Sequence, residues 1–174
     1  EEAPDQVADR ARRLGVDDLE GLLLLCSSQW ADVETAIRLH AGTPRDPSVV
    51  VIDSAQVMEA LAHGGEAGSN MQVEAVGVRA RMLSKLTGRC VILVGQANAD
   101  GDAKGPRALR HIVDVVAAYD RDAENRRLVR VTKNRFGAAD NVLFLEMTGA
   151  GLKPLRNALP AALSGARPEP GVVA

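Results

Sequence analysis

The sequence predicts an α/β fold in which a mostly parallel sheet with crossover helices is followed by antiparallel strands. Two uninterrupted aliphatic runs, 49–52 and 90–94, are typical of strands that are buried on both faces of a parallel sheet. Helical patterns precede both runs, as expected when crossover helices join parallel strands. Two later runs, 128–132 and 142–147, alternate in the manner of antiparallel strands. Aromatic residues make up only 2% of the chain, so Val, Leu, Ile and Ala must build the core.

The first half of the chain alternates between helical and strand patterns. A helix is predicted over 3–14, where Pro4 lies in the first turn and apolar residues recur on one face. Residues 22–26 form a short apolar run that predicts a buried strand. Residues 29–40 have helical spacing and are followed by Gly and Pro breakers, which lead into the central strand at 48–54.

The second half begins with a longer helix and then changes character. The spacing predicts a helix over 70–88 that ends at Thr87-Gly88, followed by the strand at 90–94. A polar loop extends to Arg107, and a strand is predicted over 112–119. The last residues, 157–174, are rich in Ala, Pro and Gly and are expected to be a linker towards a further domain, whereas 1–156 form the folded part.

Composition excludes several classes of protein. The chain has 174 residues, enough for one domain with a real core, and its net charge of −2 excludes a strongly basic nucleic-acid module while permitting local basic patches. No apolar stretch approaches the ~20 residues of a membrane span. Cys26 and Cys90 lie in apolar runs and are expected to be small buried thiols in a reducing, cytoplasmic compartment. The chain does not begin with Met, so we expect it to be a fragment.

Polar residues follow the two aliphatic strands at their carboxyl ends, where ligands of such sheets bind. Asp53 and Ser54 follow the first strand and could hold a phosphate-bound Mg²⁺, which Asp53 would contact directly or through water. Gln96 follows the second strand and could sense a terminal phosphate. Glu1 could orient an attacking water if a strand precedes it. Each assignment has an alternative. Asp53-Ser54 could cap the next element, Gln96 could be a turn residue, and Glu1 could be an acidic residue at a helix N-terminus.

Two other segments bear on phosphate chemistry. The loop 63–70 is rich in glycine, but no Gly-Lys-Ser/Thr follows it, so it does not qualify as a phosphate-binding loop and a mobile loop is the simpler interpretation. Lys133 and Arg135 alternate at a predicted strand end beside Phe136 and Gly137. By period-two spacing the two cations would point the same way, and they could neutralise a transferring phosphoryl group, including one in a neighbouring subunit's site. A solvated strand end is the alternative.

Several of these segments together resemble one family. The matching segments, in order, are Val50-Val51-Ile52-Asp53-Ser54-Ala55-Gln56, Gly68-Ser69 with Gln72, Leu93-Val94-Gly95, Gly105-Pro106-Arg107 with Leu109, His111 and Asp114, and Lys133-Asn134-Arg135-Phe136-Gly137. Their order and spacing are similar to those of the RadA (Sms) family of bacterial DNA-repair ATPases, which is related to RecA. The Lys-Asn-Arg-Phe-Gly motif is close to diagnostic of that family, and the resemblance covers nearly the whole chain.

The resemblance implies a RecA-like P-loop NTPase core that forms a hexamer on single-stranded and branched DNA and couples ATP hydrolysis to branch migration. It implies that Asp53 is the Walker B carboxylate and Glu1 the catalytic Glu, and that Lys133 and Arg135 act across a subunit interface. The loops at about 58–71 and 97–107 would face DNA. It also implies RecA as a partner, association with the bacterial nucleoid, and zinc in an N-terminal motif outside this chain.

Departures from the family pattern also lead to expectations. Gln96 stands where family members usually have His, and Asn98-Ala99 replaces a common Thr-Lys, so DNA contact would depend on Lys104, Arg107 and Arg110. The Walker A segment is absent from the sequence, so we expect no ATP hydrolysis by residues 1–174 alone and an unpaired apolar edge on the strand at 90–94. The alternatives are a RecA-shaped DNA-binding or assembly module without hydrolysis, and an unrelated doubly wound binding domain.

Overall fold

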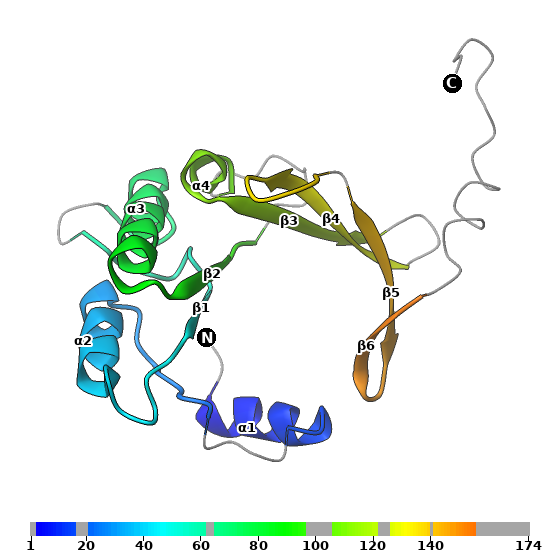
Figure 1. Ribbon diagram of the computed structural model, residues 1–174, viewed down its shortest axis with the longest axis horizontal. Coiled ribbons are helices and arrows are strands. Elements are labelled where there is room, and N and C mark those ends of the chain that lie inside the picture. The colour runs from blue at the N-terminus through cyan, green and yellow to red at the C-terminus, as the bar shows by residue number, and fades with distance from the viewer. Residues whose placement is uncertain are drawn as a thin grey trace, which may run out of the picture. The chain divides into compact units, whose positions relative to one another are not determined.

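The computed structural model describes residues 3–16, 21–61, 65–96, 106–121, 126–139 and 141–155 (Figure 1). The chain divides into two compact units, one ending at Asp114 and the other beginning at Val115. The elements of the first unit are α1 (Pro4–Arg13), α2 (Trp30–His40), β1 (Val49–Asp53), α3 (Asn70–Thr87), β2 (Cys90–Val94) and α4 (Pro106–Ile112). Those of the second are β3 (Val115–Arg121), β4 (Arg127–Asn134), β5 (Val142–Thr148) and β6 (Gly151–Pro154).

In the first unit, β1 and β2 form a parallel pair, with Val49 opposite Cys90 and Asp53 opposite Val94. Helix α3 makes the crossover between them, as predicted, and α2 and α3 lie on one side of the two strands (Figure 1). The core forms where the helices meet this side, around Ile52, Val73 and the fully buried Trp30. Trp30 Nε1 also donates to Glu34 Oε1 at 2.7 Å, so the buried indole keeps a hydrogen bond.

Helix α3 begins and ends where its sequence predicts. Ser69 is its N-cap, and the Ser69 hydroxyl accepts from the backbone N–H of Gln72. At the other end Gly88 adopts the left-handed conformation, with φ of 72°, which glycine alone reaches without strain. Its N–H donates to the carbonyl of Ser84 at 2.8 Å and closes the helix.

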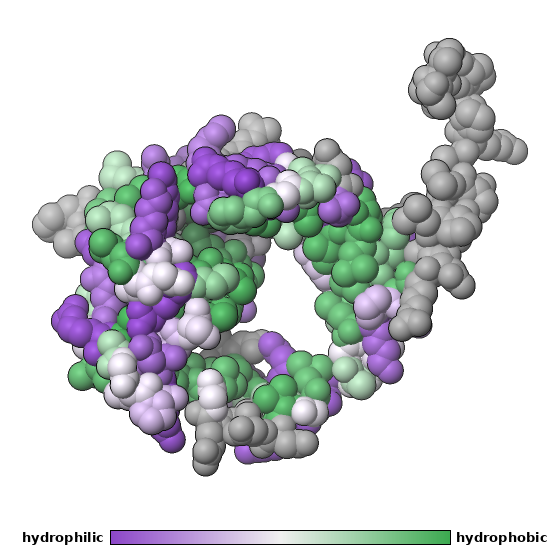
Figure 2. All heavy atoms as spheres, viewed as in Figure 1, coloured by the Kyte–Doolittle hydropathy of each residue, from purple (hydrophilic) through white to green (hydrophobic). Residues whose placement is uncertain are grey.

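The prediction that β1 and β2 are buried on both faces is wrong. Val51 is 58% exposed and Ile92 46% exposed, and Figure 2 shows hydrophobic side chains at the surface over these strands. The reason is that α2 and α3 cover only one side of the pair. Cys26 and Cys90 are free, as predicted, but both are exposed, so the expectation of buried thiols is also wrong.

Residues 22–26 do not form the predicted strand. They have no regular secondary structure and are exposed, and no strand among the described residues pairs with them. A strand needs a partner for its backbone N–H and C=O groups, and apolar composition does not supply one. In the described residues β2 pairs only with β1, so its other edge is unpaired, as expected.

Helix α4 occupies the point where a strand is predicted to begin. Ile112 is the last residue of α4, and β3 begins three residues later at Val115. The helix packs on α3 at Gly77, where a Cβ would lie 2.6 Å from Leu109 Cδ2 and 3.1 Å from Ile112 Cδ1. Glycine is therefore what allows the close approach of the two helices.

The second unit is a four-stranded antiparallel sheet in the order β3-β4-β5-β6. The alternating patterns at 128–132 and 142–147 are confirmed as the antiparallel strands β4 and β5. Strand β6, which the sequence does not predict, forms a hairpin with β5 in which Thr148 pairs with Gly151. No helix in the described part of the chain is long and apolar enough to cross a membrane.

Candidate nucleotide and DNA site

The carboxyl ends of β1 and β2 bring together two of the predicted site residues. Asp53 is the last residue of β1 and pairs with Val94, the last residue of β2, so Asp53 and Gln96 leave adjacent strands at one edge. The backbone N–H of Ala55 donates to the Val94 carbonyl at 2.8 Å and continues the pairing past the strand end. Both Asp53 and Gln96 are exposed, so a ligand can reach them.

Gln56, which sequence reasoning does not single out, links the two strand ends. Its Nε2 donates to the backbone carbonyl of Gln96 at 3.0 Å. The residue after β2 is thereby attached to the segment that follows Asp53. The only sequence signal was the position of Gln56 within the Asp-Ser-Ala-Gln stretch, which does not reveal a partner 40 residues away.

The residues at this edge fit Mg²⁺ bound to a phosphate. The Asp53 carboxylate is an oxygen ligand of the kind Mg²⁺ prefers, and the hydroxyl of the fully buried Ser54 has no hydrogen-bond partner among the described residues. The described residues hold no cluster of three or more His, Cys, Asp or Glu side chains suited to a metal. One carboxylate with water and substrate phosphates is nevertheless the usual arrangement for Mg²⁺.

The loop after β1, predicted to face DNA, is attached to α3 by one side chain. Gln72 is 1% exposed, and its Oε1 accepts from the backbone N–H groups of Ala60 at 2.9 Å and Leu61 at 3.1 Å. Its Nε2 donates to the carbonyls of Leu61 at 2.8 Å and Gly65 at 3.3 Å. This single amide therefore holds both sides of the segment 62–64. A Ser-x-x-Gln pattern at the start of α3 was the signal available in the sequence.

The opposite end of the strand pair is held by charge. The Asp46 carboxylate accepts from the backbone N–H of Gly42 and pairs with Arg89, and these two contacts lower the pKa of Asp46. Arg89 Nε also donates to the Pro47 carbonyl at 2.9 Å. Because Asp46 precedes β1 and Arg89 precedes β2, the pair secures the amino ends of the strands, away from Asp53.

The predicted DNA-contact residues are only partly described. Lys104 and the rest of the second loop, 97–105, lie outside the described residues, as does Glu1, which is predicted to orient water and not to contact DNA. Arg107 lies in α4, but its side chain is outside the described set. Arg110 lies in the last turn of α4 and is exposed. The structure therefore leaves these three as predictions.

The Lys133–Gly137 segment lies in the second unit, at the end of β4. Strand β4 ends at Asn134, so Arg135 lies in a turn, and the prediction that Lys133 and Arg135 share one strand face is wrong. Asn134 shapes this turn: its Oδ1 accepts from the Phe136 N–H at 3.0 Å, and its Nδ2 donates to the Ala138 carbonyl at 3.1 Å. A side chain that folds back on its own turn ends the strand alternation.

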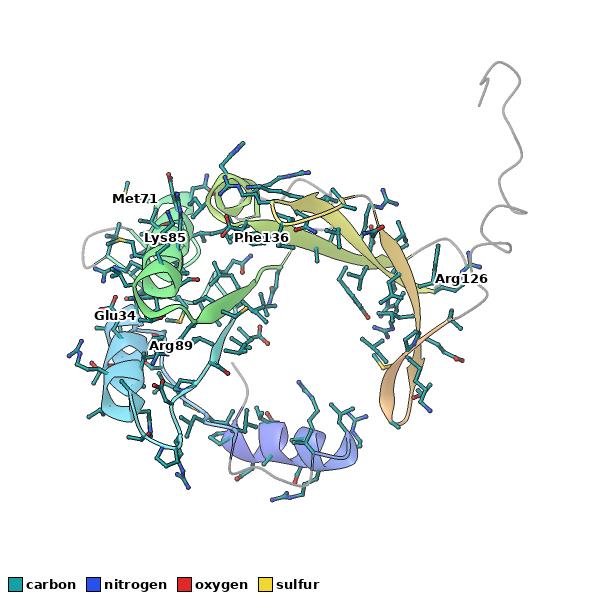
Figure 3. All side chains as sticks on the ribbon, in the orientation of Figure 1. Glu34, Met71, Lys85, Arg89, Arg126 and Phe136 are labelled. Atoms are coloured by element: carbon teal, nitrogen blue, oxygen red, sulfur yellow. The ribbon has the colours of Figure 1, made fainter. Side chains whose placement is uncertain are left out.

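A groove also lies between α2 and α3, away from the strand ends. Its volume is about 950 Å³, and Figure 3 labels Glu34, Met71 and Arg89 among the residues that line it. Most of the lining is apolar, and neither Asp53 nor Gln96 contributes to it. The groove is thus separate from the candidate phosphate site.

Curated bacterial proteins match this chain along most of its length. The DNA repair protein RadA of Escherichia coli is 34% identical over 158 residues, which are 90% of this chain and 33% of RadA. RadA of Mycobacterium tuberculosis is 38% identical over 144 residues, or 82% of this chain and 29% of RadA. RadA of Brucella abortus is 32% identical over 158 residues, or 90% of this chain and 34% of RadA.

The chain is RadA-like. It spans about a third of the length of these relatives. No protein-family model matches it. Among solved structures, a KaiC-like protein from the archaeon Pyrococcus horikoshii aligns with a TM-score of 0.66 at 17% identity, covering 89% of this chain and 72% of that protein. The predicted RecA-like α/β fold class is confirmed.

Proposed function

We propose that this RadA-like chain forms part of the ATP-hydrolysing core of a DNA repair protein. The observation that carries the proposal is the shared edge at which Asp53 and Gln96 leave paired parallel strands. Ligands of open α/β sheets bind at such an edge. From the similarity to the DNA repair proteins RadA, we infer that the ligands are a nucleotide and DNA.

At this site Asp53 would hold Mg²⁺, directly or through water, with the Ser54 hydroxyl beside it. When bound, the metal ion supplies positive charge that offsets the negative charge of the ATP phosphates. Gln96 would contact the terminal phosphate. Gln56 would hold Gln96 in place by donating a hydrogen bond to the Gln96 backbone carbonyl. Glu1 would orient the attacking water.

The basic residues would serve the DNA and a neighbouring subunit. In a hexamer, Lys133 and Arg135 would reach the nucleotide of the next subunit and stabilise charge on the transferring phosphoryl group. Lys104, Arg107 and Arg110 would contact the phosphates of single-stranded or branched DNA. Branch migration, a RecA partner, association with the nucleoid and a zinc motif elsewhere in the polypeptide follow from the same family and belong to this proposal.

The alternative is a RecA-shaped DNA-binding or assembly module that does not hydrolyse ATP. One observation favours it for residues 1–174 taken alone: the printed sequence contains no Gly-Lys-Ser/Thr of a phosphate-binding loop. We therefore expect ATP hydrolysis only from a longer polypeptide that supplies such a loop, and none from residues 1–174.

The deciding experiment is Asp53→Asn in the complete gene product. We expect steady-state ATP hydrolysis to fall by about 100-fold or more, because the oxygen ligand loses its charge. Asp5→Asn, on the exposed surface of α1, is the matched control and should leave hydrolysis unchanged. Hydrolysis that survives Asp53→Asn would reject the assigned site. DNA binding with no hydrolysis in the unaltered protein would favour the non-hydrolysing module.

A further inference from the structure

Phe136 is an exposed aromatic side chain in a chain that has few aromatic residues. The sequence holds one Trp, one Tyr and two Phe. Trp30 is buried in the core, and the ring of Phe144 lies under the Arg126 guanidinium, 5.6 Å from its centroid. Phe136, by contrast, is 80% exposed in the turn after β4, where Figure 3 labels it. An exposed aromatic ring offers a flat, apolar face on which another flat group can stack.

The turn that carries Phe136 is held in one conformation by Asn134. The two hydrogen bonds of the Asn134 side chain, to the Phe136 N–H and the Ala138 carbonyl, span the turn from both sides. Gly137 lies beside the same side chain, because a Cβ there would be in ordinary contact with Asn134 Nδ2, at 3.4 Å. A ring presented from a fixed backbone loses little conformational freedom when it binds.

Two basic residues stand close to Phe136 in the sequence. Lys133 and Arg135 lie three residues before it and directly before it, on the same turn and strand end. An exposed aromatic ring beside cations is the combination by which proteins bind nucleic acid without base-specific hydrogen bonds, with bases stacked on the ring and phosphates drawn to the charges.

We propose that Phe136 is a stacking platform for an unpaired nucleobase, and that Asn134 positions it. The inference rests on the proposed function, because it assumes that nucleotide or DNA is the ligand. Two sources could supply the base: a single-stranded DNA segment, or the adenine of ATP bound to a neighbouring copy. The chemistry recognised is the same in both cases, a flat π-face next to a phosphate.

The test compares three substitutions of Phe136 in the complete gene product. Phe136→Ala removes the ring, Phe136→Leu keeps an apolar side chain without a π-face, and Phe136→Trp keeps the ring. Filter binding would measure the dissociation constant for an oligo-dT strand and for an abasic strand of the same length, and calorimetry would measure it for ADP. Because the ring is exposed, circular dichroism should show all three variants folded.

We expect Phe136→Ala and Phe136→Leu to weaken binding of the ligand that supplies the base, DNA or nucleotide, by about tenfold. Phe136→Trp should bind that ligand as tightly as the unaltered protein does. If DNA is the source, the loss appears with oligo-dT and disappears with the abasic strand. If ATP is the source, it appears with ADP. Asn134→Ala should give part of the same loss, whereas Asn134→Asp, which keeps the acceptor for the Phe136 N–H, should give less.

Salt dependence separates this inference from the proposed function. Phe136→Ala should leave the slope of log K against log salt unchanged, while Lys133→Gln should reduce it by about 0.7 if Lys133 meets a phosphate. Equal affinities of Phe136→Ala and the unaltered protein for oligo-dT and ADP would overturn the stacking role alone. The stacking role would also be overturned, in favour of a protein contact, by either of two results. One is that Phe136→Leu binds the ligands as tightly as the unaltered protein, and the other is that the substitutions change the oligomeric state and leave the affinity unchanged. Failure of the unaltered protein to bind either ligand would overturn both proposals.

Discussion

At the scale of single residues, Gln72 shows how much one buried amide organises. The four hydrogen bonds of its side-chain amide go to backbone groups of Ala60, Leu61 and Gly65. Burial makes these bonds costly to lose, because each backbone group left behind would be desolvated without a partner. The segment after β1 therefore owes its conformation to a side chain on the next helix.

Gln72→Met tests this dependence. The substitution keeps the length of the side chain but removes both polar atoms, so we expect the free energy of unfolding to fall by about 3 kcal/mol. Gln29→Met is the matched control: the Gln29 amide makes one exposed bond to Glu59, and its loss should cost less than about 0.5 kcal/mol. Urea denaturation followed by circular dichroism would measure both. Equal effects of the two substitutions would contradict the assigned role.

At the scale of elements, the packing of α3 on α4 depends on Gly77. Replacing it by Val would place a branched side chain where Leu109 and Ile112 now lie. Overpacking of this kind costs about 1–3 kcal/mol, whereas the better helix propensity of Val over Gly returns only about 0.4 kcal/mol. We expect Gly77→Val to lower the free energy of unfolding by about 1–2 kcal/mol, measured by denaturant titration.

Gly149→Val provides the comparison for that prediction. No atom lies within 4 Å of a Cβ built at Gly149, and its φ is outside the left-handed region. We expect a change below about 0.5 kcal/mol there. A loss at Gly149 as large as the loss at Gly77 would show that glycine matters for its backbone freedom and not for the helix contact.

Most helices and strands could be predicted from the sequence, because their signals are local. The cap residues Ser69 and Gly88 mark the ends of α3, and the aliphatic runs mark β1 and β2. The segment 22–26 has the composition of a strand but lacks a partner in the described residues, and partners are not a local property. Helix α4 was not predicted for a similar reason, since its packing on Gly77 is a tertiary contact and Ile112 resembles the start of a strand in the sequence.

The candidate site likewise has parts that the sequence predicts and parts that it does not. The proximity of Asp53 and Gln96 was predictable, because carboxyl ends of parallel strands share an edge. The parts played by Gln56 and Gln72 were not, because their partners are chosen by the tertiary fold. The prediction that Lys133 and Arg135 share one strand face was wrong because the strand ends at Asn134, one residue before Arg135, where the Asn134 side chain bonds to the following turn.

At the scale of the whole molecule, the β1–β2 pair leaves both an edge and a face open. Its outer edges have no strand partner among the described residues, and Val51 and Ile92 are about half exposed on the face away from α2 and α3. Unpaired edges next to exposed apolar side chains favour association between copies. We expect residues 1–174 alone to associate as concentration rises.

The double substitution Val51→Lys with Ile92→Lys should reduce that association. Charge on the exposed face disfavours stacking of one copy on another, and since neither side chain is buried, the fold should persist. Sedimentation velocity across a concentration series would measure the effect. Arg38→Lys on α2, which leaves the charge unchanged, is the control, and unchanged association of the double variant would show that copies meet elsewhere.

The buried indole of the first unit has a practical consequence. Trp30 is the sole tryptophan and Tyr119, in β3 of the second unit, the sole tyrosine, with its hydroxyl accepting from Arg127 at 2.9 Å. Each unit thus carries one natural chromophore of its own. Excitation of the indole reports on the first unit, and the phenol absorbance reports on the second, so an unlabelled sample reveals whether the two melt together or one after the other.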